Sequence, residues 1–287
     1  MTTTLDPELL TTWIGRSETS VDVLDLRPAK LMSTLFENNI EISDKSALAP
    51  LWHWLYFPTH APLSELGEDG HPKLGDFIPP VGLPRRMWAG GRLEFFKNLT
   101  IGSEVVRCST IKDAKFKQGR TGKLCFITVS HDFSIGDTLC VREEHDIVYR
   151  DAPTPNVTPS AADLTPQLAP TDAQFSEEIC PSSVMLFRYS ALTFNGHRIH
   201  YDIDYCRSVE GYPALVFHGP LTATLLADLA QRQNPDRRLV KFQFRALAPL
   251  FSNSNFNISG RLDGNETKLW SATGQGALAM QAEAEFA

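Results

Sequence analysis

The most informative segment of the chain is YSALTFNGHRIHYDIDYCRSVEGYPALVFHGPLTATLLADLAQR, residues 189–232. Its last part, residues 220–232, predicts a helix with Pro220 in the first turn. Four strand-like runs follow this helix, at Val240–Ala248, Asn255–Asp263, Thr267–Thr273 and Gly276–Phe286. A helix followed by a sheet, without alternating strand–helix units, indicates an α+β fold and argues against a Rossmann fold.

The first half of the chain has the same order of elements. Residues 26–40 predict a helix with Pro28 in its first turn, and residues 62–82, rich in Gly, Pro and acids, predict a long surface loop. The aromatic cluster at residues 50–60 is open to two interpretations, a core or domain-packing surface and the lining of a ligand pocket. Strand-like runs then occur at Arg92–Phe96, Glu104–Lys117, Leu124–Phe133 and Thr138–Arg150.

Net charge and composition narrow the class of protein. The chain has 287 residues, a net charge of −7 and 42% hydrophobic residues, as expected for a globular protein with a sizeable core. A nucleic-acid-binding surface is usually basic, so nucleic acid is an unexpected partner. An acyl-CoA ester remains compatible with this charge, because it needs only a few local Arg or Lys residues.

The cysteines and the N-terminus bear on the compartment. The five cysteines are an odd number without a Cys-x-x-Cys pair, which disfavours a disulfide framework and a structural zinc site and favours reduced thiols in the cytoplasm. Residues 1–20 carry acidic residues and no long apolar run, so no signal peptide is expected. No run of ~20 apolar residues predicts a membrane span, so no membrane partner is expected.

The histidines at 197, 200 and 218 leave several chemistries open. His197 and His200 with Asp202 could ligate a metal, but Gly196 weakens the helix that such a site needs. A nucleophilic triad lacks a Gly-x-Ser-x-Gly motif, and purely structural histidines remain an alternative. General acid–base catalysis agrees better with the pattern, because an imidazole exchanges protons near neutral pH and the Gly219 amide lies at a helix N-terminus, where it can stabilise an oxyanion.

The same segment resembles the MaoC-like hydratase signature Asp-x-Asn-Pro-x-His at Asn195-Gly196-His197-Arg198-Ile199-His200. Longer stretches resemble one branch of that family, which contains mesaconyl-C4-CoA hydratase, itaconyl-CoA hydratase and hydroxyacyl-thioester dehydratase. These stretches are LFRYSALTFNGHRIHYDIDY, EGYPALVFHGPLTATLL, LPRRMWAGGRLEF and EEHDIVYRD. The resemblance covers roughly residues 10–287, and the branch carries Asn where the wider signature has Asp.

The resemblance implies a double hot-dog fold, with two curved antiparallel sheets that each wrap a long helix. It implies an N-terminal hot-dog at residues 1–150 that accommodates the acyl-CoA, and a catalytic MaoC-like hot-dog at residues 181–287. The proline-rich residues 151–180 predict the linker between them. Whether the chain forms a homo-oligomer is left open.

The resemblance also implies the roles of individual residues. His200 would transfer the proton, Asn195 would position water, and the backbone amide of Gly219 would stabilise the oxyanion, with no metal and no organic cofactor. Asp202 is either a second acid–base group or a structural residue. The residues expected to bind substrate are Arg85, Arg86, Trp88, Arg198 and His218, and the candidates for binding an acyl carboxylate also include Arg92 and Arg188. Alternatively, Arg85 and Arg86 next to Trp88 hold the phosphates or the adenine of CoA.

The activity that the resemblance implies is hydration of a five-carbon dicarboxylyl-CoA, itaconyl-CoA or mesaconyl-C4-CoA, to citramalyl-CoA. Alternatives are a general (R)-3-hydroxyacyl-thioester dehydratase, a non-catalytic acyl-CoA-binding hot-dog, and a thioesterase on the same fold. An arginine at the floor of the pocket would favour the dicarboxylyl substrate, and a long apolar tunnel would favour a fatty acyl chain.

Overall fold

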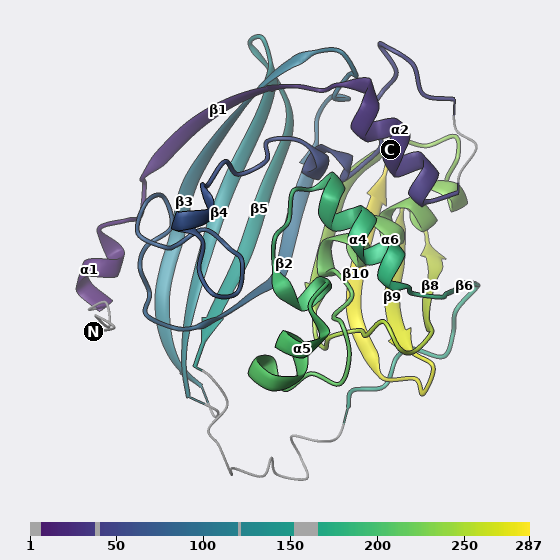
Figure 1. Cartoon of the computed structure of the whole chain (residues 1–287). Helices are drawn as coiled ribbons and strands as arrows, with labels where there is room; N and C mark the ends of the chain where they lie inside the picture. Colours follow the sequence, from purple (N-terminus) through teal and green to yellow (C-terminus); the bar gives the residue numbers. More distant parts are fainter. Residues whose placement is uncertain (1–6, 38–40, 120–121, 152–165) are drawn as a thin grey trace.

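The computed structural model describes residues 7–37, 41–119, 122–151 and 166–287, and its main feature is one sheet of ten strands. The strands lie in the order β1-β3-β4-β5-β2-β7-β10-β9-β8-β6, with antiparallel neighbours throughout (Figure 1). Each strand-like run expected from the sequence is a strand here. The bounds are β1 Ser17–Val23, β2 Arg85–Phe95, β3 Glu104–Gly119, β4 Gly122–Ile135, β5 Thr138–Arg150, β6 Phe175–Ile179, β7 Leu239–Ala246, β8 Phe256–Asp263, β9 Glu266–Thr273 and β10 Leu278–Phe286.

The two halves of the chain share this sheet, because β2 pairs with β7 from Gly90↔Arg245 to Glu94↔Lys241. The two expected sheets are therefore joined edge to edge. Gly90 permits the close approach at this junction, since a Cβ there would lie 2.5 Å from the carbonyl oxygen of Phe244. The junction brings the concave faces of both halves together on one side of the molecule.

The two edge strands, β1 and β6, were not predicted from the sequence. β1 reads SETSVDV and is largely exposed, so it lacks the apolar alternation that marks a half-buried strand. β6 lies within the predicted linker, residues 151–180, and pairs with β8 from Phe175↔Gly260 to Ile179↔Phe256. The linker is therefore shorter than predicted at its C-terminal end, and its residues 152–165 lie outside the described part of the chain.

The long helix α6 (Gly219–Gln233) confirms the helix predicted at residues 220–232. Pro220 stands in the first turn, where its missing N–H breaks no helical hydrogen bond. α6 packs against β7, β8, β9 and β10. The side chains that it buries are Leu221, Thr222, Ala223, Thr224, Leu226, Ala227, Leu229 and Ala230. The N-terminus of α6 is thereby held rigidly beside the sheet.

The N-terminal half differs from the expected plan in its helix. α2 (Leu26–Leu35) begins where residues 26–40 predicted, but it is short and packs against α4 (Ser183–Leu192) and the 3₁₀ helix η1 (Trp52–Leu55). The face of β3–β5 is instead covered by apolar side chains outside any long helix. Those in contact with this face include Leu10 from α1 (Pro7–Thr11), Val81 and Leu83, together with the half-buried Leu74, Phe77 and Ile78.

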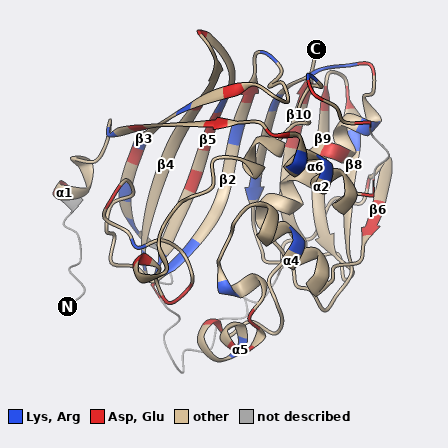
Figure 2. Ribbon diagram, turned by 45° about the horizontal axis from the view of Figure 1, so that its top comes forward, with Lys and Arg blue, Asp and Glu red and all other residues tan. Residues whose placement is uncertain are grey.

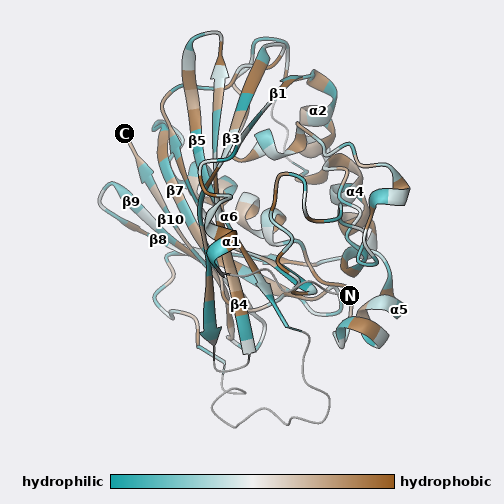
Figure 3. Ribbon diagram, turned by 90° about the vertical axis from the view of Figure 1, so that its left-hand side faces the viewer, coloured by the Kyte–Doolittle hydropathy of each residue, from teal (hydrophilic) through white to brown (hydrophobic). Residues whose placement is uncertain are grey.

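The helices and loops leave the two faces of the sheet very different. Seen edge-on, α2, α4 and α5 (Ile203–Tyr205) lie on one side of the sheet (Figure 3). Charged residues occur along β2–β5 (Figure 2), and several of them pair across neighbouring strands, as Arg92 does with Asp146 and Arg142 with Asp132. Among the described helices, none is long and apolar enough to cross a membrane. The side of the sheet that α2, α4 and α5 cover is therefore the better candidate for a functional site.

Candidate active site

His200 is held in one orientation at the end of the short 3₁₀ helix η3 (Arg198–His200). Its Nδ1 donates a hydrogen bond to the carbonyl oxygen of Val216 at 2.8 Å, so Nε2 is the ring nitrogen left to act as a base. Burial lowers the pKa of His200 to about 4, although the bond to Val216 opposes the shift. The imidazole is therefore neutral near pH 7 and ready to accept a proton.

His218 supports His200 from behind. The two rings are stacked, with centroids 3.6 Å apart and planes inclined by 18°. His218 is fully buried, and its Nε2 lies 2.9 Å from the hydroxyl oxygen of Ser190. It is absent from the described lining of the cavity, so the structure places this expected substrate-binding residue behind the base.

The buried, neutral state of His200 makes the protein sensitive to acid. In the unfolded chain the pKa returns to about 6.5, so the unfolded state binds more protons as the pH falls below that value. The folded pKa is about 4. We expect the titration of His200 to leave the free energy of unfolding unchanged above about pH 6.5. Below that value the free energy of unfolding should fall, by about 2 kcal/mol at about pH 5, and the fall should level off below about pH 4.

Urea unfolding of wild type and His200→Gln at about pH 7.5 and about pH 5 measures this effect. The difference in the free energy of unfolding between the two pH values should be smaller in the variant by about 2 kcal/mol. His60→Gln serves as the control, because His60 is exposed. An equal difference in wild type and His200→Gln would contradict the lowered pKa.

Asn195 and Gly219 reach the same cavity as His200. Asn195 follows α4; its N–H donates to the carbonyl of Ser190 at 2.8 Å and its Oδ1 accepts from the N–H of His197 at 3.0 Å. Gly219 is the first residue of α6, where backbone N–H groups lack helical acceptors and the helix dipole is positive. The three residues expected to carry the chemistry therefore line one cavity.

A loop that the sequence predicted only as a surface loop closes over this wall. Residues Leu66 to Pro72, here called the Asp69 loop, form a tight turn closed by a bridge between its ends. The carbonyl of Asp69 accepts from the N–H of Arg198 at 2.9 Å. Gly70 packs so closely that a Cβ there would lie 2.0 Å from the carbonyl oxygen of Gly196. The loop thus holds the backbone that carries His197 and His200.

The Asp69 loop also brings a second set of ionisable groups to the site. His71 Nδ1 lies 3.0 Å from Asp69 Oδ2, and its ring centroid lies 4.2 Å from that of His197. Ligand atoms of Asp69, His71 and His197 all lie within 4.8 Å of one another, a donor set that zinc accepts. The sequence suggested a different set, His197, His200 and Asp202. Among the described residues, the structure instead groups Asp69, His71 and His197.

Asp202 and Arg198 pair with each other and do not line the described cavity. Both Nε and Nη2 of Arg198 donate to Asp202 Oδ2, at 3.0 and 2.8 Å. Asp202 Oδ1 also caps α5 by accepting from the N–H of Tyr205 at 3.0 Å. Of the two roles left open for Asp202, the geometry supports the structural one.

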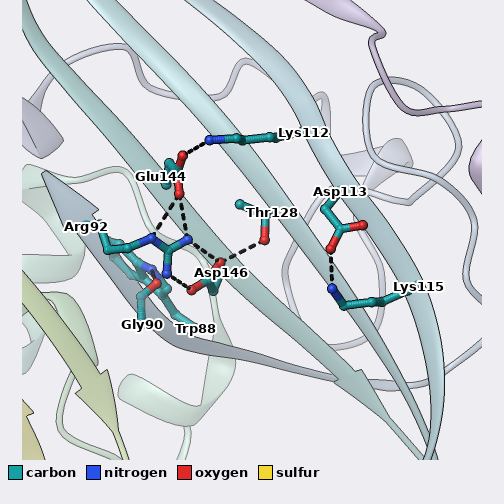
Figure 4. Close-up of polar contacts among 9 residues, drawn as sticks. All are labelled: Trp88, Gly90, Arg92, Lys112, Asp113, Lys115, Thr128, Glu144 and Asp146. Carbon is teal, nitrogen blue, oxygen red and sulfur yellow. Dashed lines mark hydrogen bonds and ion pairs between the residues drawn. The ribbon is translucent and has the colours of Figure 1, made fainter.

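The arginine candidates fall into different environments. Arg85 forms an ion pair with Glu210, 3.1 Å between Nη2 and Oε2, and Arg188 is exposed on α4. Arg92 points to the outer face of the sheet, where it binds Glu144 and Asp146 (Figure 4). Arg86 lines the cavity, as does Trp88, whose ring packs 4.1 Å from that of His145.

One large cavity of about 1050 Å³ contains both Arg86 and the residues expected to carry the chemistry. Its lining comes from both halves of the chain and includes His200, Asn195 and Gly219. The aromatic cluster at residues 50–60 serves both of its predicted roles, since Trp52 and Leu55 are core residues while His53 and Trp54 line the cavity. The sequence analysis missed several polar residues of the N-terminal wall, namely His53, His71, Arg107, His131, Glu143, His145 and Tyr149.

Comparison with known proteins agrees with this arrangement. Mesaconyl-C(4)-CoA hydratase from Chloroflexus aurantiacus is 43% identical over 278 residues, which cover 96% of each chain. The mitochondrial hydroxyacyl-thioester dehydratase type 2 of Schizosaccharomyces pombe is 29% identical over 78% of this chain and 80% of its own. These relatives are named as enzymes that add or remove water.

Solved structures show the fold. A MaoC-like dehydratase from Phytophthora capsici superposes with a TM-score of 0.69 at 14% identity, over 99% of both chains. A Mycobacterium tuberculosis protein described as a double hotdog fold superposes with a TM-score of 0.55 at 13% identity, over 96% of both chains. The expected α+β double hot-dog fold is thereby confirmed. The family model of hydroxyacyl-thioester dehydratase type 2 matches residues 51–252, and the chain belongs to that family of hydro-lyases.

Proposed function

We propose that this protein catalyses the reversible hydration of an enoyl-CoA thioester whose acyl group is a five-carbon dicarboxylate. The substrate is itaconyl-CoA or mesaconyl-C4-CoA, and the product is citramalyl-CoA. The observation that carries the proposal is His200, oriented by its bond to Val216, in the same cavity as Gly219 at the N-terminus of α6. The 43% identity to a mesaconyl-C(4)-CoA hydratase supports the substrate class.

The geometry suggests how water adds to the double bond. In mesaconyl-C4-CoA, whose double bond is conjugated with the thioester, His200 Nε2 takes a proton from a water molecule that Asn195 helps to position, and the resulting hydroxide adds to the β-carbon. Electron density moves to the thioester oxygen, which the N–H of Gly219 and the positive end of α6 stabilise. The imidazolium of His200 then returns its proton to the α-carbon, so that one water is added and the enzyme is regenerated. Itaconyl-CoA has its double bond between the β- and γ-carbons, so a proton must first move from the α-carbon to the γ-carbon, by way of His200, to give the conjugated ester.

The two halves of the chain divide the work in this proposal. Residues 1–150 accommodate the acyl-CoA, and residues 181–287 supply His200, Asn195 and Gly219. The reaction needs no metal and no organic cofactor, because an imidazole and a backbone amide suffice for it. The cytoplasm is the proposed compartment, since all five cysteines are unpaired. Assembly into a homo-oligomer stays a prediction.

A second candidate function is dehydration of a general (R)-3-hydroxyacyl thioester. The relatives from Schizosaccharomyces pombe and Saccharomyces cerevisiae, both named hydroxyacyl-thioester dehydratase type 2, favour it. Apolar side chains of the cavity, among them Leu74, Phe77 and Ile78, would accept such a chain, whereas His53, Glu143 and His145 of the N-terminal wall would lose contact with water against it.

The ultraviolet absorbance of the enoyl thioester distinguishes the two candidates. Wild-type protein is mixed in turn with mesaconyl-C4-CoA and crotonyl-CoA, and loss of the enoyl signal is followed. Itaconyl-CoA has no double bond conjugated with its thioester, so its conversion to citramalyl-CoA is followed by liquid chromatography. We expect a dicarboxylyl-CoA to have the highest kcat/KM. If crotonyl-CoA is the best substrate, the second candidate function, general dehydration, is the correct one. If none of the three esters is converted, the catalytic proposal is refuted.

A further inference from the structure

Arg86 is a cation in the cavity wall that has no partner within the part of the chain that the structure describes. Three basic side chains line the cavity among the described residues, namely Lys73, Arg86 and Arg107. Lys73 Nζ donates to the carbonyl of Ser64 at 2.9 Å, and Arg107 Nε donates to Ser20 Oγ at 3.1 Å. No described residue forms an ion pair or a hydrogen bond with the half-buried guanidinium of Arg86.

A second polar group beside Arg86 also lacks a partner. Tyr149 is the cross-strand neighbour of Arg86 in the β2–β5 pair. Its side chain lines the cavity and is only 2% exposed, and its hydroxyl finds no hydrogen-bond partner among the described residues. Buried polar groups in folded proteins are nearly always satisfied, so an orphaned hydroxyl on a side chain that lines the cavity, next to an unpaired cation, points to a missing ligand.

The surroundings define the charge of that ligand. His71, His145 and His197 lie close enough to Arg86 for its charge to act on them. Burial lowers the pKa of all three, and the charge of Arg86 acts in the same direction. The nearby carboxylates of Asp69 and Glu143 are engaged by His71 and by His53 and Trp54, and no described carboxylate forms an ion pair with Arg86. A ligand carboxylate can match the guanidinium by two parallel hydrogen bonds.

We propose that Arg86 and Tyr149 form the receptor for the second carboxylate of the acyl group, and that they select a dicarboxylyl-CoA over a monocarboxylic acyl-CoA. The inference rests on the proposed hydratase function for the reaction and adds to it the residues that choose the substrate. Arg86 supplies the charge and a planar pair of donors, and Tyr149 adds a hydroxyl donor from the neighbouring strand.

The structure of the substrate sets where a receptor for its free carboxylate must lie. In mesaconyl-C4-CoA the free carboxylate is attached to the β-carbon, the atom that gains the hydroxyl group. A receptor for it must therefore lie beside the group that activates water. Arg86 and His200 line the same cavity, and His197 lies beside His200 with the two ring centroids 5.4 Å apart. The proposal requires that a carboxylate bound at Arg86 bring the β-carbon within reach of His200.

Matched pairs of CoA esters test the proposal, because a methyl group replaces the carboxylate within each pair. Mesaconyl-C4-CoA and 3-methylcrotonyl-CoA report turnover, while the saturated methylsuccinyl-C4-CoA and isovaleryl-CoA report binding by calorimetry without any reaction. We expect Arg86→Met to lower kcat/KM for mesaconyl-C4-CoA and affinity for methylsuccinyl-C4-CoA about 100-fold, and to change the methyl partners less than threefold. Tyr149→Phe should lower the same two values about tenfold.

Arg245→Met is the control for the loss of one positive charge, since Arg245 is exposed on β7 and lies outside the described cavity lining. An equal loss for both members of a pair in Arg86→Met would show that Arg86 binds the CoA moiety, and would overturn the proposal. The proposal would also be overturned if Arg86→Met discriminated between the two esters of each pair as strongly as wild type does. The binding measurements separate the hydratase function from the carboxylate receptor at Arg86. If wild type binds methylsuccinyl-C4-CoA more tightly than isovaleryl-CoA but hydrates no ester, only the hydratase proposal fails.

Discussion

Replacing His200 with alanine is expected to lower kcat for hydration about 1000-fold, because the variant lacks the group that takes the proton from water. The effect should appear in kcat and hardly in KM, since His200 contributes to proton transfer more than to holding the CoA ester. Stopped-flow absorbance of the enoyl thioester measures both constants. The residual rate would come from Gly219 and from the positioning of substrate in the cavity.

His60→Ala is the matched control, because His60 is exposed and lies outside the described lining of the cavity. Its kcat should stay within twofold of wild type. A His200→Ala variant that folds and keeps a tenth or more of the wild-type kcat would show that another group is the base. His71 would then be the next candidate, since Asp69 already orients its ring.

Replacing Gly70 with alanine is expected to lower kcat/KM about 100-fold, although Gly70 performs no chemistry. Gly70 has φ of +87°, and a Cβ there would lie 2.0 Å from the carbonyl oxygen of Gly196. That atom is backbone, so either the Asp69 loop or the segment carrying His197 and His200 must move. A displacement of about 1 Å in a positioned base can reduce catalysis on the order of 100-fold.

Gly15→Ala isolates the contribution of backbone strain. Gly15 also has φ of +87°, but no atom lies within 4 Å of a Cβ built there. Both variants should lose about 1 kcal/mol of stability from the left-handed conformation, and only Gly70→Ala should lose activity. Thermal unfolding and kcat/KM of the two variants give the comparison. Equal activity of the two would mean that the contact between Gly70 and Gly196 does not hold the catalytic segment.

Local patterns sufficed for the elements whose stability is local or half-buried. α6 was predicted because Pro220 marks a first helical turn, and the inner strands because β-branched and aromatic residues fill them. β1 and β6 were missed because each is polar and pairs on one side only, so no apolar alternation marks it. His200, Asn195 and Gly219 were found through a motif that is contiguous in the chain.

The sequence by itself determined the α+β class, the helix that presents Gly219, and the motif that carries His200, because these depend on neighbours a few residues apart. Only the tertiary structure decided how the two halves join at β2 and β7, how the Asp69 loop closes over the motif, and which arginine reaches the cavity. Arg85, Arg86 and Arg92 lie within eight residues of one another, yet two are neutralised by carboxylates and one is not. The partners of the neutralised pair, Glu210 and Asp146, are distant in the chain, so only the folded arrangement determines which charge remains available for a ligand.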